Sequence, residues 1–129
     1  MGQESGIRKD TCITEYDSIA KRTIYQYVDL MPDFFGGYDS LLSFVDKNLK
    51  IHIPTNLSSG KVYISLIVES DGNLTNPKII RGIDNELDVE ALRLINIMPK
   101  WKVGKCNGIA VPVRQIVPIN FKQNKNKSP

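Results

Sequence analysis

The feature that most constrains the fold is a strand-like segment that ends in a turn, at residues 62–73. Apolar side chains of one parity recur along its first part, which predicts a β-strand with one buried face. These side chains are Val62, Ile64, Leu66 and Val68. The residues Ser70-Asp71-Gly72-Asn73 follow and favour a tight turn, because Asp, Gly and Asn tolerate positive φ. A second strand at residues 76–81 completes a predicted hairpin. Because Pro77 has no N–H, we expect that strand to lie at a sheet edge.

Two segments with a helical period flank the hairpin. Apolar residues recur at helical spacing over residues 38–49 and again over residues 84–97, which predicts two amphipathic helices. Asp84 is the expected N-cap of the second helix. That helix should end before Pro99, because a helix rarely continues through the residue that precedes a proline. The last predicted strand covers residues 109–121, with apolar side chains on one parity.

The order of these elements fixes the expected sheet. The hairpin reverses the chain, the second helix returns it, and the last strand can then pair antiparallel only with the first. The expected fold class is α+β: a three-stranded antiparallel sheet with a central first strand and the last strand at an edge, covered on one face by two helices. Residues 1–26 are expected to be a flexible polar lead-in, ending in a β-prone arm at residues 23–28 that lies against the domain. Residues 27–122 form the domain and residues 123–129 a disordered basic tail.

Composition excludes several classes of protein. The chain has 129 residues, of which 41% are hydrophobic, so it can build one modest core. Its net charge is +3, and basic residues are scattered among acidic ones, so we expect no nucleic-acid partner. No apolar run is long enough to span a bilayer, and the first residues lack the apolar stretch of a signal peptide. We therefore expect a soluble chain from which any export or anchoring segment has been removed, or which never had one.

A set of short motifs occurs in order along the chain. They are Met31-Pro32-Asp33-Phe34-Phe35-Gly36-Gly37, Gly60-Lys61-Val62-Tyr63-Ile64, Asp71-Gly72, Arg81-Gly82, Leu87-Asp88-Val89-Glu90-Ala91-Leu92, Met98-Pro99-Lys100-Trp101, Gly104-Lys105, Val111-Pro112-Val113 and Pro118-Ile119-Asn120-Phe121. Together they resemble the TonB C-terminal domains of Bacteroidetes-type proteins, over about residues 27–122. The resemblance implies a periplasmic module that binds the TonB box, a short extended segment of outer-membrane receptors. It also implies that the module couples the inner-membrane proton-motive force to transport, and that the last strand accepts the receptor peptide.

The sequence departs from that family pattern in three places. Phe35 replaces the usual proline before Gly36-Gly37, Ile53-Pro54 replaces Tyr-Pro, and the helical stretch that normally follows is reduced to residues 55–59. The membrane helix and proline-rich spacer of energy transducers are also missing from this chain. An inner-membrane energising complex is therefore an expected partner only if the full-length protein has an anchor. The alternative is a standalone exported adaptor or sensor domain of the same fold, with no energy-transducing role.

The last strand carries the predicted peptide-binding residues. Pro112 and Pro118 share one parity, and N–H groups of alternate strand residues point to the same side, so the even-numbered side is the expected free edge. Main-chain groups of Arg114 and Ile116, and the carbonyls of both prolines, would face a guest strand. An alternative is that the prolines only protect an open edge from aggregation. The predicted site is Val111, Pro112, Val113, Arg114, Gln115, Ile116, Val117 and Pro118. Exposed edge strands also allow a homodimer.

No set of residues predicts catalysis, a cofactor or a metal site. His52 is the single histidine and lacks the companions that a metal needs. Asp84, Glu86, Asp88 and Glu90 fall in the first turns of a helix, where they complement its dipole. Trp101 is expected to anchor a loop on the core. Cys106 is interpreted as an inert thiol, although Cys12 and Cys106 could pair and the sequence does not decide this.

Overall fold

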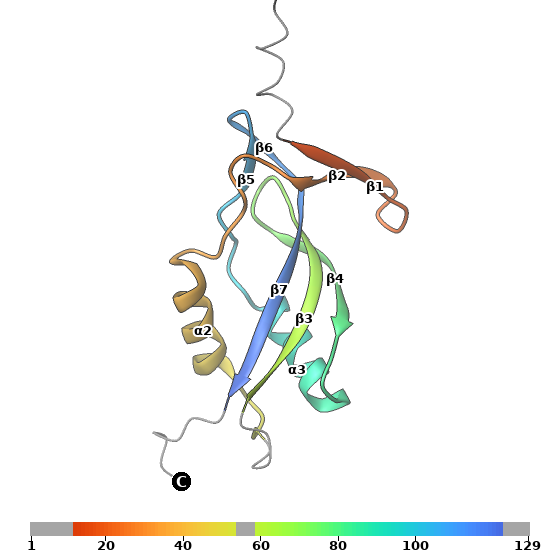
Figure 1. Cartoon of the computed structure of the whole chain (residues 1–129). Coiled ribbons are helices and arrows are strands. Elements are labelled where there is room, and N and C mark those ends of the chain that lie inside the picture. The colour runs from red at the N-terminus through yellow and green to blue at the C-terminus, as the bar shows by residue number, and fades with distance from the viewer. Residues whose placement is uncertain (1–11, 54–58, 123–129) are drawn as a thin grey trace, which may run out of the picture.

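The computed structural model describes residues 12–53 and 59–122, and every structural statement below concerns these residues. In chain order the elements are β1 (Ile13–Asp17), β2 (Arg22–Tyr27), α2 (Gly37–Asn48), β3 (Ser59–Val68), β4 (Leu74–Arg81), α3 (Asn85–Asn96), β5 (Gly104–Cys106), β6 (Ile109–Val111) and β7 (Val113–Lys122). Figure 1 shows the long strands β7 and β3 running side by side, with the β1–β2 hairpin at one end of them.

The main sheet has five strands in the order β1-β2-β7-β3-β4, and β5 and β6 form a separate two-stranded sheet. β3 pairs antiparallel with β7 along ten residues and with β4 on its other side, so its predicted central place is confirmed. β2 pairs with β7 in parallel, which makes the sheet mixed. The α+β class and the two helices are therefore correct, whereas a purely antiparallel sheet of three strands is wrong.

The two extra strands come from the segment that was expected to be a flexible lead-in. β1 and β2 form an antiparallel hairpin, and the β-prone arm predicted at residues 23–28 coincides with β2. The hairpin has weak apolar periodicity because few of its residues are buried; Ile24 and Val28 are the fully buried ones near it. Residues 1–11 and the basic tail at residues 123–129 lie outside the described residues.

Both helices pack on one face of the sheet. The β3–β7 register places Val62 opposite Ile119 and Ile64 opposite Val117, and these side chains share one core with Leu41 of α2 and with α3. Asp84 caps α3 as predicted, because its Oδ1 accepts a hydrogen bond of 2.8 Å from the Leu87 N–H. Trp101 is buried and meets Phe34 edge-on, with ring centroids 5.9 Å apart. Its role is therefore packing.

The turn between β3 and β4 follows the sequence prediction. Gly72 has φ 91°, and its carbonyl accepts a hydrogen bond of 2.9 Å from the Trp101 N–H. A Cβ at this position would lie 2.6 Å from the Trp101 carbonyl oxygen, so only glycine fits here without a shift. β4 lies at a sheet edge, as expected from Pro77.

The single strand predicted at residues 109–121 is wrong, because the structure divides it at Pro112. β6 pairs with β5, Val111 lying opposite Gly104, whereas β7 pairs with β3. Pro112 has no N–H to give to either ladder, so it stands where the chain passes from one sheet to the other. Within the described residues, no helix combines the length and the apolar content that a bilayer crossing needs.

Candidate functional site

Within the described residues, another strand pairs with the outer side of β7 at one end only. β2 meets β7 at the single register pair Tyr25–Val113, and the Tyr25 N–H donates a hydrogen bond of 2.9 Å to the Pro112 carbonyl. No further strand pairs with this side of β7 among residues 12–53 and 59–122. We call the outer main chain of β7 from Gln115 to Lys122 the open rim. The prediction that the whole last strand lies at an edge is therefore wrong for its first residues.

The structure divides the eight predicted site residues into two groups. Val111 is buried in β6, the Pro112 carbonyl already accepts a hydrogen bond from the Tyr25 N–H, and Val113 is the residue of β7 that pairs with Tyr25 of β2. These three residues do not belong to the open rim. Arg114 marks its boundary, and Gln115, Ile116, Val117 and Pro118 lie along it. The residues that the sequence prediction omitted are those that follow, Ile119 to Lys122.

The position of Pro118 orients the main chain along the open rim. In an antiparallel ladder, opposite residues alternate between hydrogen-bonded and non-bonded pairs. Pro118 lies opposite Tyr63 and has no N–H, so we infer that this pair is a non-bonded one. The neighbouring pairs at Val117 and Ile119 then carry the bonds to β3. Main-chain groups of Ile116, Pro118 and Asn120 consequently point outward.

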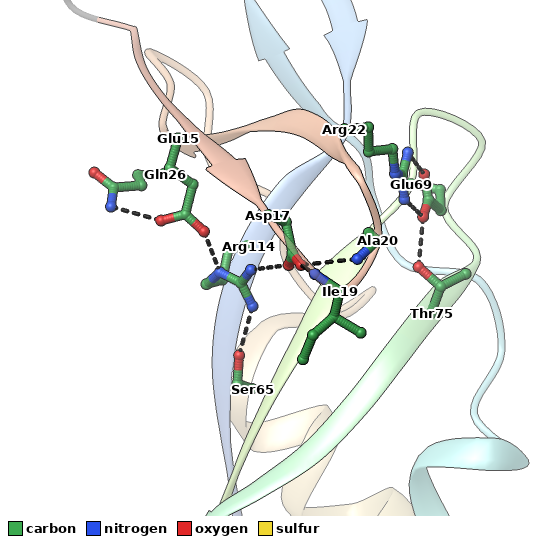
Figure 2. A network of polar contacts seen from close by, with 10 residues as sticks. All are labelled: Glu15, Asp17, Ile19, Ala20, Arg22, Gln26, Ser65, Glu69, Thr75 and Arg114. Atoms are coloured by element: carbon green, nitrogen blue, oxygen red, sulfur yellow. Dashed lines mark hydrogen bonds and ion pairs between the residues drawn. The ribbon is translucent and has the colours of Figure 1, made fainter.

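The side chain of Arg114 fastens the β1–β2 hairpin to β7 (Figure 2). Its Nε donates to Glu15 at 2.6 Å, one Nη donates to the Ser65 Oγ at 2.9 Å, and the other Nη binds Asp17. The hydrogen bond from Arg114 lowers the pKa of Glu15. The Ala20 N–H is the main cause of the lowered pKa of Asp17, with Arg114 next. Both carboxylates are therefore kept ionised, and their charges are paired with Arg114 within the hairpin contact.

A second ion pair ties the hairpin to the β3–β4 turn (Figure 2). Arg22 of β2 donates to Glu69 from both terminal guanidinium nitrogens, Nη1 and Nη2, with the Nη1–Oε1 contact at 3.0 Å. Glu69 also accepts a hydrogen bond from the Thr75 hydroxyl. The pairing with Arg22 is the largest cause of the lowered pKa of Glu69. The hairpin thus holds both β7 and the β3–β4 turn through partly buried charges.

A disulfide between Cys12 and Cys106 joins the start of the hairpin to the end of β5. The interpretation of Cys106 as a free inert thiol is therefore wrong. The two cysteines are 94 residues apart in sequence, and their Cα atoms are 6.1 Å apart. Asp29 lies beside them, and its carboxylate accepts from the Asn107 N–H at 2.9 Å. Disulfides persist in oxidising compartments such as the bacterial periplasm, which agrees with an exported domain.

A hollow of about 530 Å³ lies between the hairpin turn and the sheet face away from the helices. Tyr16 and Ile19 line it from the hairpin, and Ser65, Lys78 and Ile80 line it from the sheet. Sequence reasoning missed the hairpin and this hollow. A local signal was the β-prone run at residues 22–27, and Cys12 comes just before the first strand of the hairpin.

Comparison with known proteins gives one match. The family described as "Gram-negative bacterial TonB protein C-terminal" matches residues 56–123, just over half of the chain. Neither a curated protein nor a solved structure matches the chain significantly. The matched region contains β3, β4, α3, β5, β6 and β7, and the β1–β2 hairpin and α2 lie outside it.

Proposed function

Because the chain belongs to the TonB protein C-terminal family of Gram-negative bacteria, we propose that it binds the TonB box of outer-membrane receptors by strand addition along the open rim of β7. The family is periplasmic, non-enzymatic and associated with transport. Strand addition needs no catalytic group, because an edge strand offers unpaired N–H and C=O groups to a guest strand. In a chain that is anchored in the inner membrane, the same contact would couple the proton-motive force to the receptor.

The observation that carries this proposal is the length of β7 beyond its contact with β2. That contact is limited to the pair Tyr25–Val113, while β7 continues to Lys122. Apart from the terminal strand residue Lys122, the outward groups are the N–H and C=O of Ile116 and Asn120 and the C=O of Pro118. At about 0.5–1.5 kcal/mol net for each hydrogen bond, the five groups give roughly 2–8 kcal/mol. The cost of association reduces this sum, so we expect a weak, reversible complex.

Alternate N-methylation of the guest tests the proposal without changing the protein. A TonB-box peptide is titrated into the ¹⁵N-labelled domain, and the amides of Ile116 and Asn120 should shift most. N-methylation of alternate guest residues should abolish binding of the peptide when the methylated residues are those whose N–H groups face β7. The peptide methylated on the other parity is the matched control and should bind normally. Saturable binding that leaves residues 115–122 unshifted would refute the proposed site.

A further inference from the structure

The sheet has one face that neither of the two helices in the described part of the chain covers. We call the surface of β7, β3 and β4 opposite α2 and α3 the helix-free face. The register places Lys61 beside Asn120, Tyr63 beside Pro118 and Ser65 beside Ile116 on it. The hairpin β1–β2 covers only its end at Arg114 (Figure 2). Among residues 12–53 and 59–122, no further strand pairs with the sheet over the rest of this face and no helix packs on it, and this part begins directly at the open rim.

The helix-free face is basic. Four cationic side chains share it by register, since Lys61 and Lys122 belong to the β3–β7 pair and Lys78 and Arg81 to the β3–β4 pair, opposite Ser65 and Tyr63. All four are exposed, and none forms an ion pair with another described residue. The nearby carboxylates are already paired, Glu15 and Asp17 with Arg114 and Glu69 with Arg22. The face therefore carries uncompensated positive charge.

Exposed apolar side chains lie among these cations. Ile116 of β7 is 53% exposed and Ile80 of β4 is 48% exposed. Tyr16 and Ile19 of the hairpin are 67% and 72% exposed and line the same hollow as Ile80 and Lys78. An exposed apolar group of this kind, rimmed by charges, is typical of an interaction surface. A partner that matches this face should therefore combine acidic and apolar groups.

We propose that the helix-free face binds an acidic, partly apolar polypeptide segment that belongs to the same partner as the guest strand on the open rim. This inference rests on the proposed function, and it adds a second contact surface to it. The two surfaces are continuous, because Ile116 and Pro118 present main chain to the rim and side chains to the helix-free face. The partner's carboxylates pair with Lys61, Lys78, Arg81 and Lys122, and an apolar side chain enters the hollow beside Ile80.

The shape of the face favours an extended polypeptide over an anionic membrane surface. The apolar groups surround a hollow, since Ile80 of β4 lines it together with Tyr16 and Ile19 of the hairpin. A flat bilayer would meet the hairpin first and leave the hollow unfilled. A single side chain of an extended segment fits a volume of about 530 Å³ with room for its neighbours.

Two labelled peptides separate the contributions of the two surfaces. The neutral probe alternates Thr and Val and is designed to bind at the open rim alone. The acidic probe adds a Gly-Ser linker and an alternating Glu-Ile segment to the same neutral strand. Fluorescence anisotropy should show the acidic probe binding about tenfold more tightly at low ionic strength. Each exposed ion pair contributes at most a factor of about five to the affinity, so this gain needs more than one of the cations on the face. Added salt should remove most of this gain.

The variant K78E/R81E tests the face and leaves β7 unchanged. It should cancel the gain of the acidic probe while the affinity of the neutral probe changes by less than about twofold, since both substituted residues lie on β4, away from the open rim. The matched control K100E/K102E makes the same change in net charge at exposed positions outside the sheet, and it should keep the gain. Urea unfolding of both variants checks that each is folded.

The outcomes are distinguishable. Equal affinity of the two probes for the wild type, or an equal loss of gain in both variants, would overturn the second surface while leaving the open rim intact. Failure of the neutral probe to bind refutes the proposed function, whereas the Glu-Ile segment measured alone still reports on the helix-free face. Vesicles containing phosphatidylglycerol are the third arm. Binding to them that K78E/R81E abolishes, without any gain for the acidic probe, would assign the face to a membrane and overturn the proposal.

Discussion

Replacing both cysteines by serine, as C12S/C106S, should destabilise the domain strongly. The disulfide closes a loop of 94 residues, which includes nearly every described element between β1 and β5. In the chain-entropy model, a crosslink over about 100 residues stabilises the folded state by about 4.7 kcal/mol, and removal of native disulfides commonly costs 2–5 kcal/mol. We therefore expect a loss of about 3–5 kcal/mol, equivalent to roughly 10–20 °C in Tm for a domain of this size.

The assay is urea unfolding followed by circular dichroism, with and without a reductant. Reduction should shift the midpoint of the wild type to that of C12S/C106S, and it should leave the variant unchanged. The single variants C12S and C106S serve as controls and should match the double variant, because either one removes the bond. A double variant within about 1 kcal/mol of the oxidised wild type would refute the reasoning, since it would show that the crosslink hardly restricts the unfolded chain.

Three further predictions concern the fold and its charges. Gly72→Ala should lower the free energy of unfolding by more than about 2 kcal/mol in thermal unfolding, because the new Cβ would meet the Trp101 carbonyl at 2.6 Å. Gly108 has φ 82° and open space around it, so Gly108→Ala should lower the free energy of unfolding by only about 1 kcal/mol. Equal losses in the two variants would contradict the steric argument. The pKa values of Glu15, Glu69 and Glu90 are lowered from 4.5, by Arg114, Arg22 and Arg93 respectively. The stabilisation by these ion pairs is therefore complete above pH 4.5 and is lost as pH falls through the pKa values of the folded state. Urea midpoints that stay level between neutral pH and pH 3 would be inconsistent with this. Glu90→Gln should lower the free energy of unfolding by about 1–3 kcal/mol, because buried Glu90 accepts hydrogen bonds from Arg93 and from the Lys50 N–H. The control Glu86→Gln changes an exposed residue and should leave stability almost unchanged. A larger loss in Glu86→Gln than in Glu90→Gln would contradict the role of burial.

The elements that the sequence predicted well are those whose signal is local. The period of residues 38–49, the cap at Asp84 and the Asp-Gly turn each depend on neighbouring residues, and the structure has α2, α3 and the β3–β4 turn at those places. The pairing of the last strand with the first followed from chain direction alone. These inferences needed no knowledge of distant contacts, which explains why they are confirmed.

The hairpin could not be predicted in the same way, because long-range contacts hold it. Arg114 binds carboxylates almost a hundred residues earlier in the chain, and Cys12 bonds to Cys106 at a similar separation. Nothing in the local pattern of residues 13–17 reports these partners. For the same reason the expected free edge began too early, at Val111, since the cover over Pro112 and Val113 comes from Tyr25.

The position of the disulfide determines where a mechanical load enters the domain. A pull on the chain ahead of Cys12 reaches Cys106 through a covalent bond, only a few residues before β7 begins. Tension therefore bypasses the β1–β2 hairpin, whose hydrogen bonds and ion pairs need not break in sequence. The strand that is proposed to hold the guest stays coupled to the incoming force even when the hairpin yields.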